Sequence, residues 1–216
     1  MQITLVGHQW WWEIRYDPPV LQERFTTANE MHIPVGRPVQ IKLQSSDVIH
    51  SFWAPNLHGK TDLIPSYTGS IVIQADTPGV FRAPCAEYCG RQHAKMALLV
   101  IAESEAQYAA WYANEKKASA APRDAGTTRG QEVFLGAACP LCHTIRGTPS
   151  QGKVAPELTH LAARRTIAAG TLMNNREPLA GWVVNSQGIK PGNFMPPIPV
   201  AARDLNALLD YLASLR

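Results

Sequence analysis

The first hundred residues alternate short apolar runs with turn residues. Between Val39 and Leu43, apolar side chains alternate with polar ones, which is the pattern of a strand with one buried and one solvent-facing side. Similar runs, separated by segments that contain Pro or Gly, predict strands at residues 3–6, 9–16, 39–43, 48–53, 71–75, 79–82 and 98–102. About seven short strands at this spacing predict an all-β Greek-key sandwich.

The second half of the chain has helical periodicity instead. Its last residues carry leucines at a spacing near 3.6, which predicts an amphipathic closing helix: Leu205, Leu208, Leu209, Leu212 and Leu215. Ser104–Gln107 and Thr128–Gln131 each fit a capping box and predict helix starts. Residues 116–126 are small and polar without periodicity, as in a flexible linker. We therefore expect two domains, an all-β domain at residues 1–115 and an all-α domain at residues 127–216.

Composition agrees with two soluble domains. The chain has 216 residues, of which 45% are hydrophobic and 17% are charged, enough for two apolar cores. No run approaches the ~18 apolar residues that cross a bilayer. The net charge is −1 for residues 1–104 and +4 for residues 105–216, and the short basic pairs in the second half do not indicate nucleic-acid binding.

The densest chemistry lies between Cys85 and Met96. These residues include two thiols, the imidazole of His93 and a thioether, and His50 lies upstream. A mononuclear blue-copper site needs one Cys, two His and a weak axial Met. Because one cysteine is in excess, the pattern favours two copper ions bridged by both thiolates, with a backbone carbonyl completing the ligand set. Such a site carries single electrons and performs no bond chemistry.

Two other interpretations of Cys85 and Cys89 stay open. An exported chain with four cysteines can form a disulfide between them, although this would leave His93 and Met96 without a role. A structural zinc site is the second alternative, but zinc rarely recruits a thioether.

The run Cys139-Pro-Leu-Cys142-His143 has the C-x-x-C-H pattern of covalent haem c attachment, with two thioether bonds and His143 as proximal iron ligand. Met195 is the predicted distal ligand, because prolines after it stop helix formation and hold its thioether in place. A helix, the haem motif, a methionine loop and a closing helix are the parts of a class I cytochrome c.

Two further residues are weaker candidates for the distal position. Met173 lacks flanking prolines and is predicted to be a packing residue. His160 is predicted to lie near the haem or to cap a turn.

Four segments of the first half resemble subunit II of haem-copper cytochrome c oxidases, in the same order: Gly7–Trp12, Asp47–Trp53, Gly59–Pro65 and Cys85–Met96. The resemblance covers roughly residues 1 to 112 and implies a cupredoxin fold. It also implies a binuclear copper centre, CuA, whose ligands are the side chains of His50, Cys85, Cys89, His93 and Met96 and the carbonyl of Glu87. The family usually has Gly where Ser66 stands, which puts the geometry of that loop in doubt.

The resemblance implies two further roles. The Glu87 carboxylate would help to bind magnesium at the contact with subunit I. Trp10 would receive electrons from cytochrome c, and a plain core or interface aromatic is the alternative for this residue.

Together, the resemblance and the haem motif predict an electron-transfer subunit of a terminal cytochrome c oxidase. Electrons would pass from the fused haem c to CuA and on to subunit I, and the whole proton-translocating complex would reduce dioxygen to water. The expected partners are subunit I, other membrane subunits and an external donor protein. Because haem c is attached outside the cytoplasm, we expect the outer, periplasmic or extracellular, face of a bacterial cytoplasmic membrane. We also expect a soluble fragment of a membrane-anchored parent.

Three other functions fit parts of the sequence. A CuA-containing subunit of a nitric oxide reductase remains an alternative, because its chemistry would also lie in a partner subunit. A copper carrier would leave the haem motif without a purpose. Nitrous oxide reductase needs a further copper cluster, which seven histidines, three of them already assigned, do not readily supply.

Overall fold

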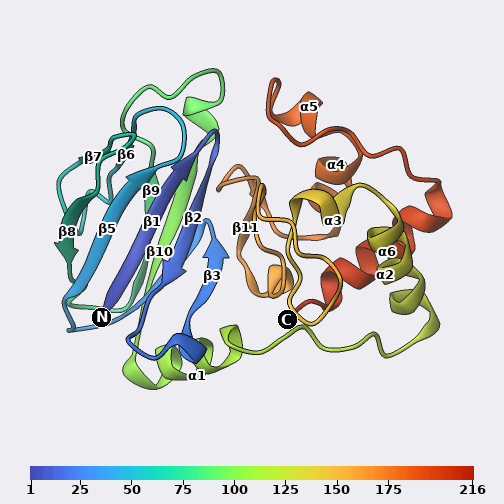
Figure 1. Cartoon of the computed structure of the whole chain (residues 1–216), viewed down its shortest axis with the longest axis horizontal. Coiled ribbons are helices and arrows are strands. Elements are labelled where there is room, and N and C mark those ends of the chain that lie inside the picture. Colours follow the sequence, from blue (N-terminus) through green and yellow to red (C-terminus); the bar gives the residue numbers. More distant parts are fainter. The chain divides into compact units, whose positions relative to one another are not determined.

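The computed structural model describes residues 1–216, which divide into two compact units (Figure 1). Unit 1 comprises Met1–Lys116 with Ala168–Thr171, and unit 2 comprises Lys117–Ile167 with Leu172–Arg216. The domain limits at residues 115 and 127 stay predictions. The first helix of unit 2, however, already begins at Ala125, inside the segment predicted as linker.

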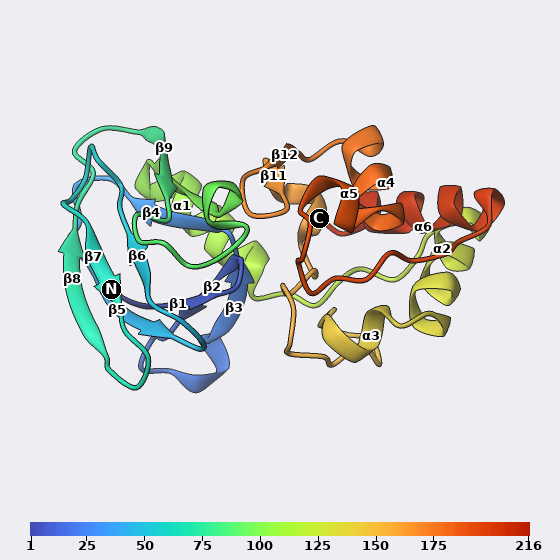
Figure 2. The same ribbon diagram turned by 90° about the horizontal axis from the view of Figure 1, so that it is seen from above.

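Unit 1 is a cupredoxin-like β-sandwich, as expected, and its last strand is followed by the helix α1 (Glu105–Glu115), which belongs to the same unit. The larger sheet has the strand order β3-β2-β1-β5-β8, with bounds β1 Gln2–His8, β2 Trp11–Tyr16, β3 Phe25–Ala28, β5 Val39–Ser45 and β8 Gly69–Ile73. The second sheet has the order β4-β10-β9, with bounds β4 Glu30–Pro34, β9 Gly79–Pro84 and β10 Ala97–Glu103. Figure 2 separates these layers, with β4 and β9 on one side and β1, β2 and β3 on the other.

Smaller elements complete unit 1. A short antiparallel pair is formed by β6 (His50–Phe52) and β7 (Thr61–Leu63). Single 3-10 turns occur at η1 (Leu21–Glu23) and η2 (His93–Lys95). The β6 strand and the η2 turn each carry one of the predicted copper ligands.

The strand prediction is correct for β5, where Val39, Ile41 and Leu43 are fully buried and Gln40 is exposed. It missed β3 and β4, which are separated by the single residue Asn29 with φ +62°. Asn tolerates this left-handed conformation better than most residues. The chain therefore leaves one sheet and enters the other within one residue, which no turn motif marks.

Unit 2 is helical, as expected for a cytochrome c domain. Its elements are α2 Ala125–Gly136, α3 Cys139–Cys142, η3 Leu161–Ala163, β11 Thr166–Ile167, β12 Leu172–Met173, α4 Arg176–Val184, α5 Ser186–Ile189 and α6 Ala202–Ser214. The predicted closing helix is confirmed by α6, which buries Leu208, Leu209 and Leu212. No helix in either unit is both long and apolar enough to span a membrane.

One of the two predicted helix starts is confirmed. Ser104 caps α1 and forms a capping box with Gln107. The start at Thr128 is wrong, because Asp124 caps α2 and pairs with Thr127 in a capping box of its own. An Asp at the N-cap accepts a backbone N–H as well as Ser or Thr does, so the helix begins one turn earlier.

Helices α2 and α6 cross at very close range. A Cβ added at Gly130 would lie 2.0 Å from the backbone oxygen of Ala207, so only a glycine fits there. Phe134 and Tyr211 pack beside this crossing, with ring centroids 6.0 Å apart. The crossing anchors the core that carries the haem motif.

Candidate metal and haem sites

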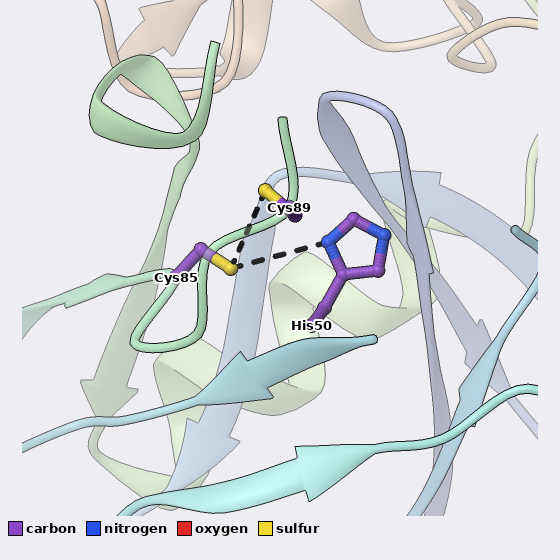
Figure 3. A group of neighbouring side chains, drawn as sticks. All are labelled: His50, Cys85 and Cys89. Atoms are coloured by element: carbon purple, nitrogen blue, oxygen red, sulfur yellow. Dashed lines mark hydrogen bonds between the residues drawn. The ribbon is translucent and has the colours of Figure 1, made fainter. Parts of the chain in front are cut away.

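His50, Cys85 and Cys89 come together at one end of the sandwich, with their side chains pointing toward one another (Figure 3). The Cys85 Sγ lies 3.9 Å from the His50 Nδ1 and 3.8 Å from the Cys89 Sγ. Strand β6 contacts the loop that runs from Cys85 to Met96, which we call the copper loop. The contacts are an isolated antiparallel β-bridge between Phe52 and Cys85 and a hydrogen bond from the Ala86 N–H to the Ser51 carbonyl (3.0 Å). Two segments far apart in sequence thus share one buried site.

The other predicted ligands extend the same group. The Cys89 Sγ lies 3.7 Å from the His93 Nδ1 and 3.8 Å from the Met96 Sδ. The carbonyl oxygen of Glu87 lies 3.3 Å from the Cys85 Sγ. All six predicted donor atoms therefore form one continuous set, with the two sulfur atoms of the cysteines at its centre.

The distances in this set fit donors that share metal ions. Bonds of about 2.3 Å from metal to sulfur and about 2.0 Å to nitrogen, at a tetrahedral angle, separate two ligands of one ion by roughly 3.5–3.8 Å. Thiolate, imidazole and thioether are also donors that suit copper. A disulfide has sulfur atoms about 2.05 Å apart, whereas Cys85 and Cys89 are both free and 3.8 Å apart.

The two thiols share one proton between them. The hydrogen bond between the two cysteine side chains lowers the pKa of Cys85 to about 3, against the opposing effect of burial. The same contact raises the pKa of Cys89 above its ordinary value. One thiolate is therefore present at neutral pH, and metal uptake would displace the remaining proton.

Asp47 orients His50. Its Oδ1 lies 2.7 Å from the His50 Nε2, and because a carboxylate accepts, the imidazole donates from this nitrogen. The Nδ1 lone pair is thereby left for the sulfur side of the site. Burial acts to lower the pKa of His50, but the contacts with Asp47 and Cys85 outweigh it and raise that pKa.

Gly7 in β1 makes room for the same imidazole. A Cβ at this position would lie 2.6 Å from the His50 Cδ2 and 2.8 Å from its Cγ. Sequence reasoning assigned no role to Gly7 or Asp47. The sequence does hold a local signal for the role of Asp47, because its carboxylate lies three residues before the predicted ligand His50.

Trp10 belongs to the core cluster of unit 1, in agreement with the alternative interpretation of this residue. Its indole N–H also donates to the Cys89 carbonyl, with an Nε1-to-oxygen distance of 2.9 Å. Trp10 is therefore both a core residue of unit 1 and a hydrogen-bond partner of the loop that contains Cys89.

The Glu87 carboxylate lies partly exposed, 3.9 Å from the Lys60 Nζ. The structure has one group of three or more His, Cys, Asp or Glu side chains that could hold a metal ion, and it consists of His50, Cys85 and Cys89. The Glu87 carboxylate is not part of this group. A magnesium role for Glu87 stays a prediction.

The haem motif occupies the single turn of α3. Cys139 and Cys142 are its first and last residues, and the His143 N–H donates to the Cys139 carbonyl (3.0 Å). The His143 Nδ1 donates to the Pro156 carbonyl (2.6 Å), which leaves Nε2 with its lone pair for an iron atom. Burial lowers the pKa of His143 and so favours the neutral form that binds iron.

Met195 is held through its backbone. Its carbonyl accepts from Ser186 Oγ (2.6 Å) and Gln187 Nε2 (2.9 Å), and its N–H donates to Asn193 Oδ1 (2.8 Å). None of these hydrogen bonds involves His143. The rigidity predicted for this loop thus arises from three polar side chains in addition to the prolines.

Large apolar side chains stand exposed beside both parts of the proposed haem site. Leu141 lies inside the C-x-x-C-H run and Phe194 precedes Met195, and each is 75% exposed. Val154, whose N–H donates to the Cys142 carbonyl (3.1 Å), is 72% exposed. Uncovered apolar surface at these positions fits a haem, whose macrocycle is itself apolar.

The two rivals of Met195 lie elsewhere. Met173 is 63% exposed, so the prediction that it is a packing residue is wrong. His160 is buried, and its Nε2 lies 3.2 Å from the Lys117 carbonyl; its side chain does not cap η3.

Comparison with known proteins matches each half to a family. Residues 20–103 match the family described as cytochrome c oxidase subunit II, periplasmic domain, and residues 127–216 match the family described as cytochrome c. The first half belongs to the subunit II family and the second to the cytochrome c family. The resemblance found in the sequence is thereby confirmed, including the second domain.

Relatives with both halves exist. The chain is 39% identical to cytochrome c oxidase subunit 2 of Alkalihalophilus pseudofirmus over 215 residues, which is 99% of this chain and 61% of the relative. It is 29% identical to the subunit 2 of Bacillus subtilis, covering 99% of this chain and 62% of the relative. The chain thus spans about three fifths of the length of these relatives.

Solved structures also resemble the first half. The periplasmic domain of subunit II of the cytochrome oxidase of Bradyrhizobium japonicum is 28% identical, with a TM-score of 0.49, over 53% of this chain and 92% of that chain.

Proposed function

We propose that this chain is the electron-transfer subunit of a cytochrome c oxidase, and that it passes electrons from a covalently bound haem c to a binuclear copper centre and on to subunit I. The observation that carries the proposal is the continuous set of six donor atoms around Cys85 and Cys89. When bound, two thiolate-bridged copper ions supply a one-electron carrier that needs little rearrangement, and haem c supplies a second carrier.

In this proposal Cys85 and Cys89 would both hold the copper ions. The side chains of His50, His93 and Met96 and the Glu87 carbonyl complete the ligands. Support comes from the spacing of the donor atoms and from the contact of the two cysteine sulfur atoms at 3.8 Å. Asp47 keeps the His50 Nδ1 directed at the sulfur atoms through its contact with the opposite ring nitrogen.

Trp10 is the proposed residue through which electrons enter the copper centre. Its indole is one hydrogen bond away from the peptide of Cys89, which shortens the through-bond connection to a bridging ligand. Glu87 would bind magnesium through its carboxylate once subunit I supplies further ligands.

In unit 2, Cys139 and Cys142 would form the thioether bonds to haem c. His143 and Met195 would bind the iron, a ligand pair that raises the haem potential and suits an electron donor to copper. We propose an all-β domain at residues 1–115 and a cytochrome c domain whose first helix, α2, begins at Ala125, joined by a linker that starts at residue 116 and ends at Asp124. A tether of this length keeps two redox domains at high effective concentration.

The proposed setting is the outer face of a bacterial cytoplasmic membrane, in a complex with subunit I and other membrane subunits that reduces dioxygen to water. An external protein would donate electrons to the haem. Support comes from the periplasmic description of the matched family and from relatives named cytochrome c oxidase subunit 2.

The decisive experiment is metal and haem analysis of the purified chain with optical and EPR spectra. We expect two copper atoms and one haem per chain, and copper hyperfine lines of one electron shared equally by two nuclei. A single exchangeable copper would instead indicate a copper carrier. Oxygen and nitric oxide assays on the assembled complex would separate an oxidase from a nitric oxide reductase.

A further inference from the structure

The turn between β1 and β2 consists of Gln9 and Trp10 and lies against the copper loop. The backbone N–H of Gln9 donates to the Oδ2 of Asp47 (2.7 Å). The other oxygen of that carboxylate, Oδ1, accepts from the His50 Nε2 (2.7 Å). Gln9 therefore holds the carboxylate that orients one proposed copper ligand.

The side chain of Gln9 reaches a second proposed ligand. Its Nε2 donates to the Cys89 carbonyl (2.8 Å), and the Trp10 Nε1 donates to the same oxygen (2.9 Å). A carbonyl oxygen has two lone pairs, and both are thus engaged by one turn. The peptide that follows Cys89 is fixed in orientation by these two contacts.

Gly90 allows this close approach. Its φ is +110°, and a Cβ there would lie 3.0 Å from the Gln9 Nε2 and 3.1 Å from the Trp10 Cζ2. The copper loop and the turn are therefore packed together at a distance that no other residue type permits without rearrangement.

We infer that Gln9 is a positioning residue of the proposed copper centre, bracing the Asp47 carboxylate through its backbone and the Cys89 peptide through its side chain. This inference rests on the proposed function. Gln9 thus contacts both of the other segments, around residues 47 and 89, through hydrogen bonds of its backbone and of its side chain. Metal sites tolerate ligand shifts of only about 0.2 Å. Equal sharing of one electron by two copper ions would require that Cys89 be held in a fixed orientation.

The test uses the whole chain loaded with copper and haem. Gln9→Met keeps the length of the side chain and removes its donor, while the backbone N–H still holds Asp47. Loss of an outer hydrogen-bond partner typically costs 10–100-fold in metal affinity. We expect copper release to a chelator to be faster by roughly this factor, copper hyperfine lines that show unequal sharing, and an unchanged haem potential.

A second variant and a control isolate the cause. Gln9→Glu places a carboxylate against the Cys89 carbonyl and should weaken copper binding further, because two acceptors then face each other. Gln40→Met makes the same exchange as the first variant at an exposed position of β5, where the Gln40 Nε2 donates to the Ser70 Oγ (3.3 Å). It should behave as the parent chain does.

Wild-type hyperfine lines and wild-type copper release in Gln9→Met would overturn the inference, provided that the copper-free variant unfolds at the temperature of the parent. If Gln9→Met unfolds at a lower temperature than the parent, Gln9→Glu is compared with the parent instead. Parental hyperfine lines and parental copper release in Gln9→Glu would then overturn the inference. A parent chain that binds a single copper or none would overturn the proposed function itself, a result visible before any variant is compared.

Discussion

Gly7→Ala should displace His50 from the copper site. The added Cβ would meet the imidazole at 2.6 and 2.8 Å, whereas ordinary contacts begin at 3.4 Å, so the ring has to move by about 0.8 Å. His50 is fully buried and its Nε2 lies 2.7 Å from the Asp47 carboxylate, so the ring has no open space on its other side. A shift of this size exceeds the tolerance of about 0.2 Å for a metal ligand.

Two quantities should change together. Overpacking a well-filled core costs about 1–3 kcal/mol, which denaturant unfolding of the copper-free chain measures. Displacing His50 should weaken copper binding by more than the 10–100-fold typical of an outer-shell change, because the ligand itself moves. Chelator competition and EPR spectra of the loaded chain measure this second effect.

Gly69→Ala is the matched control. Gly69 lies in β8 of the same domain, and a Cβ there would have its nearest neighbours at 3.7 Å, an ordinary contact. This variant should unfold and bind copper as the parent does. Two copper atoms with parental affinity and spectrum in Gly7→Ala would show that Gly7 does not determine the position of His50.

Three further changes have defined outcomes. Asp47→Ala removes the acceptor for the His50 Nε2 and should lower copper affinity about 10–100-fold in a chelator competition; unchanged affinity would contradict its role. Gly130→Ala should destabilise the cytochrome unit by at least about 1–3 kcal/mol, because the added Cβ clashes with the Ala207 carbonyl. This clash outweighs the gain of about 1 kcal/mol in helix propensity. Denaturant unfolding followed at the haem band measures the change. Ser66→Gly should raise the free energy of unfolding by about 1 kcal/mol, since Ser66 has φ +65° and a side chain makes this conformation costly; a destabilised variant would refute that account.

Local patterns were sufficient where the signal is contained in one segment. The alternation in β5 and the leucine stripe of α6 each predicted an element that the structure has. Two predictions failed for different reasons. The start of α2 is set by a second local pattern, the capping box of Asp124 and Thr127, which the prediction at Thr128 overlooked. The break between β3 and β4 depends on a tertiary contact, because the Asn29 Oδ1 accepts from the Trp12 N–H (2.8 Å) across the sheet.

The Ser66 loop shows an intermediate case. Sequence comparison with the family exposed the departure from Gly, but only the structure shows that Ser66 adopts the left-handed conformation that a glycine favours. Ser66 therefore carries a conformational cost that a glycine at the same φ would not.

The predicted ligands and the residues that position them differ in how visible they are in a sequence. Few residue types bind copper, so Cys85, Cys89 and His93 stand out once they occur close together. Gln9 has no such chemistry, and its partner, the Cys89 carbonyl, belongs to a residue 80 positions away. Any residue has that carbonyl, so no pattern of residue types can reveal the pairing. Contacts between a side chain and a distant backbone group can therefore be identified only from the fold, because every residue has the same backbone groups and the sequence does not show which of them lie close together.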